Sequence, residues 1–311
     1  MRLTNRAYKI SMAIDIDDEA RRLQAFESTD NPFQRLARVR QARWRERRQL
    51  PIGEHRGRPL GSRLPIPFAR ETLANYLTDT IRDVVRAEVL DPKRSAGKLY
   101  GQPRIFNDLL SSQPLCFNLF GELQADLGLA TRTLAALSGG HIELVTAIDF
   151  EHSPGRRDAK YTGDRSAFDV FVEYVATGGR RGFLGVEVKY HEDLGDPPAE
   201  HRGRYDEVAA LMGAFRPEAL GRLREKPLQQ IWRDHLLVGS LVADPGAGYD
   251  EGRFVFLSPA ENLRCRDAVT AYRTCLANEG SFSAWTLEAV ASAVRDAGAG
   301  EWIDDLSARY L

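Results

Sequence analysis

The sequence predicts an α/β protein whose central sheet begins with an antiparallel three-stranded meander, is flanked by helices and carries a helical N-terminal extension. Polar and apolar residues alternate in 141–150, as expected for a strand, and two further strands are expected at 168–175 and in the largely apolar segment 182–190. Gly178-Gly179 lies between the second and third segments and favours a hairpin turn. A fourth strand is expected at 252–258, after intervening helices, which predicts a mixed sheet.

Helical periodicity continues on both sides of these strands. Before them, helices are expected at 34–49, 72–90, 109–127 and 131–137. After the third strand, they are expected at 205–215, 217–224 and 228–242, and further helices follow the fourth strand to the end of the chain. This order divides the chain into an extension at 1–104, a core at 105–260 and C-terminal helices at 261–311.

The N-terminal extension is rich in arginine. Residues 35–63 contain ten arginines and two acidic residues, with Trp44 among them. Such a stripe suits contacts to phosphates, and interleaved Arg and Trp side chains suit stacking on bases. We therefore expect Arg43, Trp44 and Arg47 to contact nucleic acid. The alternative is a solvated helix face held against acidic parts of the same chain.

Composition excludes several protein classes. The chain has 311 residues, and its 43 basic and 44 acidic residues nearly cancel, so net charge indicates no acidic or basic partner. Its three cysteines form no C-x-x-C pair and are poor material for a disulfide framework, which predicts a reducing cytoplasm. No stretch approaches the roughly 18 apolar residues of a membrane span, and residues 1–30 lack the apolar core of a signal peptide.

Charged residues interrupt the apolar third strand. Glu187 and Lys189 lie two residues apart, so they share one face of the strand. If the hairpin turns at Gly178-Gly179, the numbers of paired residues sum to about 357, which places Asp169 opposite the neighbourhood of Glu187 and Lys189. Cross-strand neighbours lie roughly 5 Å apart, close enough for two carboxylates to hold one divalent cation.

These three side chains suit one kind of chemistry. Carboxylates without His or Cys ligands favour Mg²⁺ or Mn²⁺ over zinc. A lysine beside them can help to deprotonate an attacking water or stabilise charge on a phosphoryl transition state, while the metal polarises the phosphoryl oxygen. The combination suits hydrolysis of a phosphodiester. A structural network of Asp169, Glu187 and Lys189 that holds the hairpin is the alternative.

The chain resembles the PD-(D/E)XK nuclease superfamily, the restriction-endonuclease-like fold, over residues 105–260. Asp169 stands at the position of the family's Asp, with Phe168 in place of the preceding proline, and Glu187-Val188-Lys189 matches the E-x-K motif. The resemblance implies that Asp169, Glu187 and the Val188 carbonyl ligate the metal and that Lys189 serves the water. Residues 111–121 also resemble a bacterial branch of restriction-type endonucleases.

The resemblance implies two further contributions to the site from helices. Family members often supply a Glu from the first core helix, where this chain has Glu122, and a polar residue from the helix after the third strand, where it has Gln230. Arg233 lies three residues after Gln230, on the same helix face, and could contact a phosphate. Surface exposure is the alternative for these helical residues.

Together, these features predict a metal-dependent phosphodiesterase that acts as an endonuclease on DNA, in bacterial restriction, defence or repair. The alternatives are an RNA-directed or structure-specific nuclease, a non-cleaving nucleic-acid-binding protein on the same fold, and a small-molecule metalloenzyme. No helix-turn-helix or zinc-finger reader is evident in the sequence, so specificity is expected to come from loops, from a homodimer or from a partner.

Overall fold

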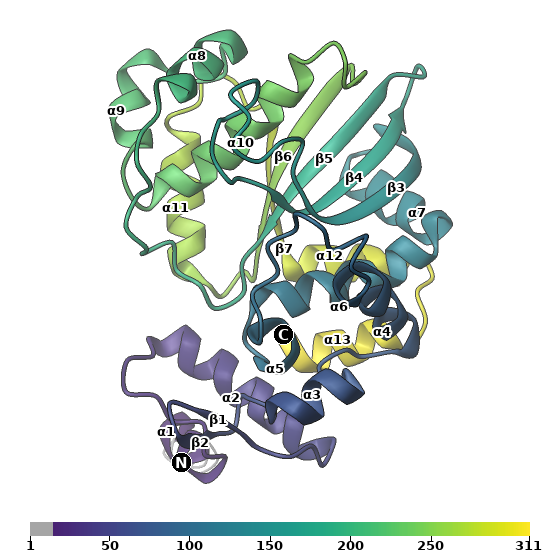
Figure 1. The fold of residues 1–311 in the computed structure, drawn as a ribbon, viewed down its shortest axis with the longest axis vertical. Coiled ribbons are helices and arrows are strands. Elements are labelled where there is room, and N and C mark those ends of the chain that lie inside the picture. Colours follow the sequence, from purple (N-terminus) through teal and green to yellow (C-terminus); the bar gives the residue numbers. More distant parts are fainter. Residues whose placement is uncertain (1–14) are drawn as a thin grey trace, which may run out of the picture.

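A mixed sheet of five strands forms the centre of the computed structural model, which describes residues 15–311. The strands are β3 (Ile142–His152), β4 (Phe168–Ala176), β5 (Arg181–Val188), β6 (Glu251–Ser258) and β7 (Phe282–Thr286). They lie side by side in this order (Figure 1). β3, β4 and β5 pair antiparallel, whereas β5 with β6 and β6 with β7 pair parallel. The predicted α/β class with an antiparallel start is confirmed.

The hairpin between β4 and β5 forms where the glycine pair predicts it. Gly178 and Gly179 both have positive φ, 85° and 78°, a conformation that glycine adopts without strain. Val170 lies opposite Val186, within one residue of the expected register. The start of β4 and the end of β5 therefore meet at one edge of the hairpin.

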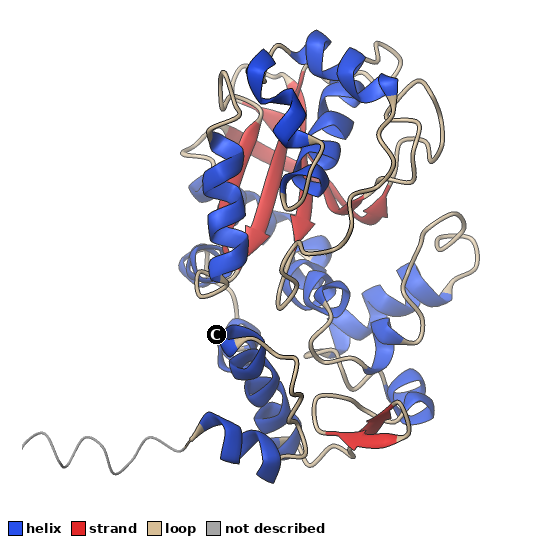
Figure 2. Ribbon diagram, turned by 90° about the vertical axis from the view of Figure 1, so that its left-hand side faces the viewer, coloured by secondary structure: helices blue, strands red, loops and turns tan. Residues whose placement is uncertain are grey.

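Helices cover both faces of the sheet (Figure 2). On one face, the core contains apolar side chains of α6 (Ser112–Ala125), α7 (Leu127–Leu137), α12 (Leu287–Asp296) and α13 (Trp302–Tyr310). On the other face, it contains those of α8 (Gly203–Met212), α9 (Leu220–Leu223), α10 (Leu228–Val242) and α11 (Leu263–Arg273). A short 3₁₀ helix, η2 (Pro217–Ala219), precedes α9.

The N-terminal elements α1 (Ile16–Arg22), α2 (Pro32–Arg47) and the short hairpin of β1 (Gly53–His55) and β2 (Arg58–Leu60) lie at the end of the molecule away from the sheet (Figure 1). After α3 (Ile66–Thr72), the helices α4 (Asp79–Val85) and α5 (Arg104–Asn107) lie beside α6. α2 begins at a capping box in which Asn31 and Gln34 bind each other's backbone N–H groups, and it packs against α13.

Two local predictions were wrong. The helix expected at 72–90 is interrupted, because Leu73 adopts a left-handed conformation and Thr78 caps a new helix; a π-helical turn, η1 (Arg86–Leu90), then follows α4. β7 was also missed. It has five residues, and the last, Thr286, is already the N-cap of α12. So short a strand gives little room for a period of two to become visible.

Within residues 15–311, no helix is both long enough and apolar enough to cross a membrane. The cysteines Cys116, Cys265 and Cys275 are all buried and free.

Candidate active site

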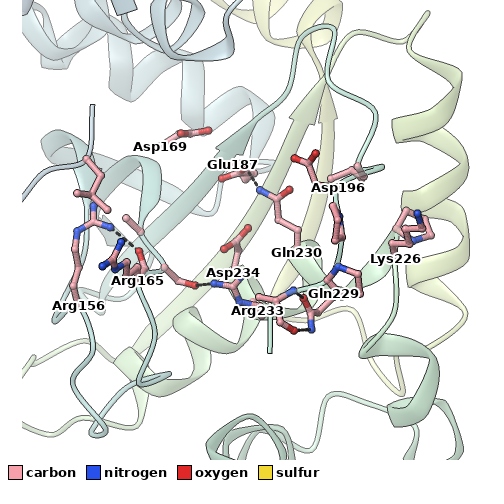
Figure 3. Close-up of a pocket in the computed structure, with 18 of the residues that line it drawn as sticks. Arg156, Arg165, Asp169, Glu187, Asp196, Lys226, Gln229, Gln230, Arg233 and Asp234 are labelled. Carbon is pink, nitrogen blue, oxygen red and sulfur yellow. Dashed lines mark hydrogen bonds between the residues drawn. The ribbon is translucent and has the colours of Figure 1, made fainter. Parts of the chain in front are cut away.

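A cavity of about 390 Å³ opens where the end of β5 meets the starts of β4 and α10 (Figure 3). Its wall includes Asp169 of β4, Glu187 of β5, and Gln230, Arg233 and Asp234 of α10. The hairpin and the parallel strand pairing bring these elements together, so residues more than 60 positions apart in the sequence line the same cavity.

Asp169 is tied to the strand that carries Glu187. Its Oδ2 atom accepts a 2.9 Å hydrogen bond from the backbone N–H of Val188. Burial raises the pKa of Asp169 well above its ordinary value, and the negative charge of Glu187 raises it further. A cation bound between the two carboxylates would relieve this repulsion.

Two donors hold the Glu187 carboxylate. Its Oε1 atom accepts hydrogen bonds from Lys189 Nζ at 2.6 Å and from Gln230 Nε2 at 2.7 Å. Burial alone would lower the pKa of Lys189, but the charges of Glu187, Glu192 and Asp169 outweigh burial and raise it. The Lys189 ammonium is therefore a fixed positive charge beside the carboxylates.

The oxygen atoms at this point suit a hard divalent cation. Within a strand, the C=O and N–H groups of one residue point to the same neighbour, so the Val188 carbonyl lies on the side of Asp169. Two carboxylates and a carbonyl are donors that Mg²⁺ and Mn²⁺ prefer. Across residues 15–311, no three Asp, Glu, His or Cys side chains are grouped closely enough to hold an ion. Water would complete the coordination, as is usual for Mg²⁺.

Basic side chains stand around the carboxylates. Arg156, Arg165, Lys226 and Arg233 all line the cavity, and Arg165 and Lys226 are exposed. Arg156 forms a 2.7 Å ion pair with Glu151, which also lines the cavity. Asp196 is an exposed acid in the same lining. Exposed basic side chains near the buried carboxylates suit a substrate that carries phosphates, because the bases attract phosphates and the carboxylates hold cations.

Arg233 is held rigidly by a buried carboxylate. Its Nε atom donates to Asp164 at 2.8 Å and its Nη2 atom to Ser166 at 3.1 Å. Burial opposes ionisation of Asp164, but the charge of Arg233 and a hydrogen bond from Tyr205 outweigh it, so the pKa of Asp164 is lowered. The charged pair keeps the guanidinium fixed at the cavity wall.

Gln229, the neighbour of Gln230, fastens a loop to the cavity. Its amide accepts from the N–H of Ala199 at 2.6 Å and donates to the carbonyl of Ala199 at 2.7 Å. Pro197 and Pro198 of this loop line the cavity together with Gln229. The loop between β5 and α8 is therefore positioned by α10.

Asp234 was not singled out from the sequence. The residue is 6% exposed and lines the cavity, and its Oδ2 atom has no hydrogen-bond partner among the described residues. Burial raises the pKa of Asp234, and the charge of Glu187 raises it further. The spacing in the sequence could have indicated Asp234, because it lies four residues after Gln230 and therefore on the same helix face.

The remaining predicted residues lie elsewhere. Glu122 of α6 is outside the cavity and accepts a hydrogen bond from the hydroxyl of Thr78, the N-cap of α4. Cys116 of the same helix is fully buried. The structure therefore brings Asp169, Glu187, Lys189, Gln230 and Arg233 together, but not Glu122.

The predicted nucleic-acid contacts of α2 also lie outside the cavity. Trp44 is 4% exposed, and the guanidinium of Arg309 lies 3.9 Å from the centre of its ring. Arg43 forms a 2.9 Å ion pair with Glu19, and Arg47 donates to the carbonyl of Ala308. These side chains join α2 to α1 and α13.

Comparison with known proteins gives one finding on the family. A family model described as the PD-(D/E)XK nuclease superfamily matches residues 28–311. No curated protein and no solved structure matches the chain. The matched region includes the strands that carry Asp169 and Glu187 and the helix that carries Gln230 and Arg233.

Proposed function

The chain belongs to the PD-(D/E)XK nuclease superfamily, and from this premise we propose that it is a metal-dependent endonuclease that hydrolyses phosphodiester bonds in DNA. One observation carries the proposal. Asp169 and Glu187 line a single cavity, Lys189 binds Glu187 at 2.6 Å, and basic side chains surround them. A network that served only to hold the hairpin would not need an open cavity or a basic rim.

Each residue at the centre has a role in hydrolysis. Asp169, Glu187 and the Val188 carbonyl would hold Mg²⁺ or Mn²⁺, which when bound supplies Lewis-acid polarisation of the phosphoryl oxygen and of the attacking water. Lys189 provides positive charge beside the water and the phosphoryl oxygens, where negative charge develops. Gln230 keeps Glu187 oriented through its 2.7 Å hydrogen bond. The attacking water gives up one proton to solvent as its oxygen forms a bond to phosphorus, the bond from phosphorus to one ester oxygen breaks, and that oxygen takes up a proton from solvent and leaves as a hydroxyl.

The rim of the cavity would hold the nucleic-acid backbone. Arg165 and Lys226 are exposed and would meet the phosphates of the backbone. Arg233 would contact the scissile phosphate or its neighbour with the N–H groups that Asp164 and Ser166 do not use, so its ion pair with Asp164 would stay intact. A place in bacterial restriction, defence or repair is part of this proposal. The three free thiols agree with a reducing compartment.

The test is a cleavage assay on supercoiled DNA, linear DNA and RNA, with Mg²⁺, with Mn²⁺ and without either ion. We expect the wild-type protein to nick supercoiled DNA only with a divalent ion. Asp169→Ala and Lys189→Ala should each lower the rate at least about 100-fold, because each removes a group that acts on the reacting atoms.

Glu173→Gln is the matched control. Glu173 is an acid on β4, as Asp169 is, but it binds Tyr249 away from the cavity, so we expect its variant to cleave at the wild-type rate. Equal behaviour of the wild type, Asp169→Ala and Lys189→Ala on every substrate would refute the nuclease. Metal-dependent cleavage of RNA but not of DNA would support the nuclease activity and would show that the substrate is RNA.

A further inference from the structure

Asp234 is a buried carboxylate that lacks the partner such a group needs. A buried polar group without a hydrogen bond costs free energy, and an unpaired buried charge costs more. Glu187, the other buried carboxylate in the wall, has Lys189 and Gln230 as donors, whereas Asp234 Oδ2 has none among the described residues. The protein therefore maintains an unfavourable group at its cavity.

The side chain points at the proposed metal site. Asp234 lies one helical turn after Gln230, whose amide binds Glu187. Figure 3 shows the Asp234 carboxylate directed from α10 into the cavity, on the side of Glu187. It thus adds negative charge to the place where Asp169 and Glu187 already lie.

The two cations whose charges act on Asp234 both bind other groups. The guanidinium of Arg233, the adjacent residue, is bound to Asp164 and Ser166. The Lys189 ammonium is bound to Glu187. Neither of them donates a hydrogen bond to Asp234 Oδ2, so a divalent ion in the cavity would supply a positive charge that this carboxylate lacks.

We propose that Asp234 takes part in divalent-cation binding, as a third carboxylate that reaches the ion through a bound water. This inference rests on the proposed function, and it deepens the description of that site. Direct ligation by all three acids is excluded, since no three acidic side chains among residues 15–311 are grouped closely enough to share an ion. Residues that act on a metal through a water or a ligand typically contribute 10- to 100-fold to metal affinity.

The experiment measures binding of Mn²⁺ and Mg²⁺ alone, without nucleic acid, by isothermal titration calorimetry and by the rise in melting temperature on ion addition. Asp234→Asn keeps the shape of the side chain and removes its charge. We expect it to weaken ion affinity about 10- to 100-fold and to reduce the ion-dependent rise in melting temperature. Without ion, its melting temperature should equal or exceed that of the wild type, because an unpartnered charge has been removed.

Asp244→Asn is the matched control. Asp244 is the second residue after α10 and is also buried, but it is held by Lys160 and Tyr161 and lies outside the cavity. The same substitution there should leave ion affinity unchanged and should lower the melting temperature without ion. Asp234→Ser provides a second variant if Asp234→Asn does not fold.

Asp169→Asn separates this inference from the proposed function. If Asp169→Asn loses ion binding and Asp234→Asn keeps it, Asp234 has no part in the site, although the site stands. If Asp169→Asn also binds the ion as the wild type does, the proposed metal site itself is refuted. A fall in the melting temperature of ion-free Asp234→Asn, with ion affinity unchanged, would make Asp234 a structural residue and overturn the inference.

Discussion

Substitution of Gly185 tests how packing positions the catalytic strand. A Cβ atom at this position would lie 2.4 Å from Cε1 and 2.5 Å from Cδ1 of the Phe168 ring. Carbon atoms in contact normally lie about 3.5–4.0 Å apart, so the ring would have to move by roughly 1 Å. Phe168, the first residue of β4, is fully buried on one face of the sheet and packs beside Phe171 and Phe183. Gly185→Ala should therefore overpack the core and cost about 1–3 kcal/mol of unfolding free energy.

The displaced ring should also disturb the site, because Phe168 directly precedes Asp169. Misplacement of a reacting group by about 1 Å can cost about 100-fold in rate. We expect Gly185→Ala to lower both kcat/KM for DNA cleavage and the affinity for Mn²⁺. Urea unfolding, followed by circular dichroism, measures the stability, and the plasmid assay measures the rate.

Two further variants make the reasoning refutable. Gly221→Ala adds the same methyl group in α9, where no atom lies within 4 Å, so the protein should keep or slightly gain stability. Phe168→Leu removes the colliding ring edge, so the double variant Gly185→Ala/Phe168→Leu should be more stable than the sum of the single effects predicts, by about 0.5–3 kcal/mol. Strict additivity, or a Gly185→Ala protein as stable as the Gly221→Ala protein, would show that the collision does not occur.

Three other substitutions address parts of the structure that support the site. The charge of Arg233 helps to lower the pKa of Asp164 below its ordinary 3.8. The ionised carboxylate therefore contributes stability above pH 3.8, and this contribution is lost as the pH falls through the pKa of the folded state. In urea unfolding from about pH 5 downward, the unfolding free energy of Asp164→Asn should fall less steeply with pH than that of the wild type. Gln229→Ala removes both bonds to Ala199 and should release the loop, which faster amide hydrogen exchange and earlier proteolytic cleavage at 195–202 would report. Trp44→Ala should lower the unfolding free energy by about 3–5 kcal/mol, since the ring is 4% exposed in the core; a loss of nucleic-acid binding without this destabilisation would instead support the stacking role expected from the sequence.

The sequence was sufficient for the hairpin and the residues it brings together. Alternation in 141–150 and the apolar run at 183–190 indicated strands, and Gly178-Gly179 placed the turn within one residue of the observed register. These patterns are local in the sequence, so they can be recognised without knowledge of the tertiary structure. Asp169 could be set near Glu187 for this reason alone. The role of Phe168, which stands in place of the family's proline, could not be predicted from the sequence. In the structure its ring occupies the space that a side chain at position 185 would need.

Asp234 shows where local signals end. Its spacing from Gln230 assigns both residues to one helix face, but not whether that face meets solvent, the sheet or a cavity. That depends on how α10 packs against β5 and β6, which joins residues far apart in the sequence. The absence of a donor for Asp234 is likewise a property of the packed structure, and no spacing predicts it.

The arginines of α2 show that the partners of charged side chains also depend on tertiary structure. Counted along 35–63, they form a basic stripe, yet their acidic partners come from other parts of the chain. Arg43 pairs with Glu19, Arg40 with Glu261 and Arg48 with Asp305. An arginine that is already paired gains less from a phosphate, because the existing ion pair has to be broken first. Arg165 and Lys226 are exposed at the cavity, so under the proposed function we expect them to meet the nucleic-acid backbone before the arginines of α2, which join α2 to α1 and α13.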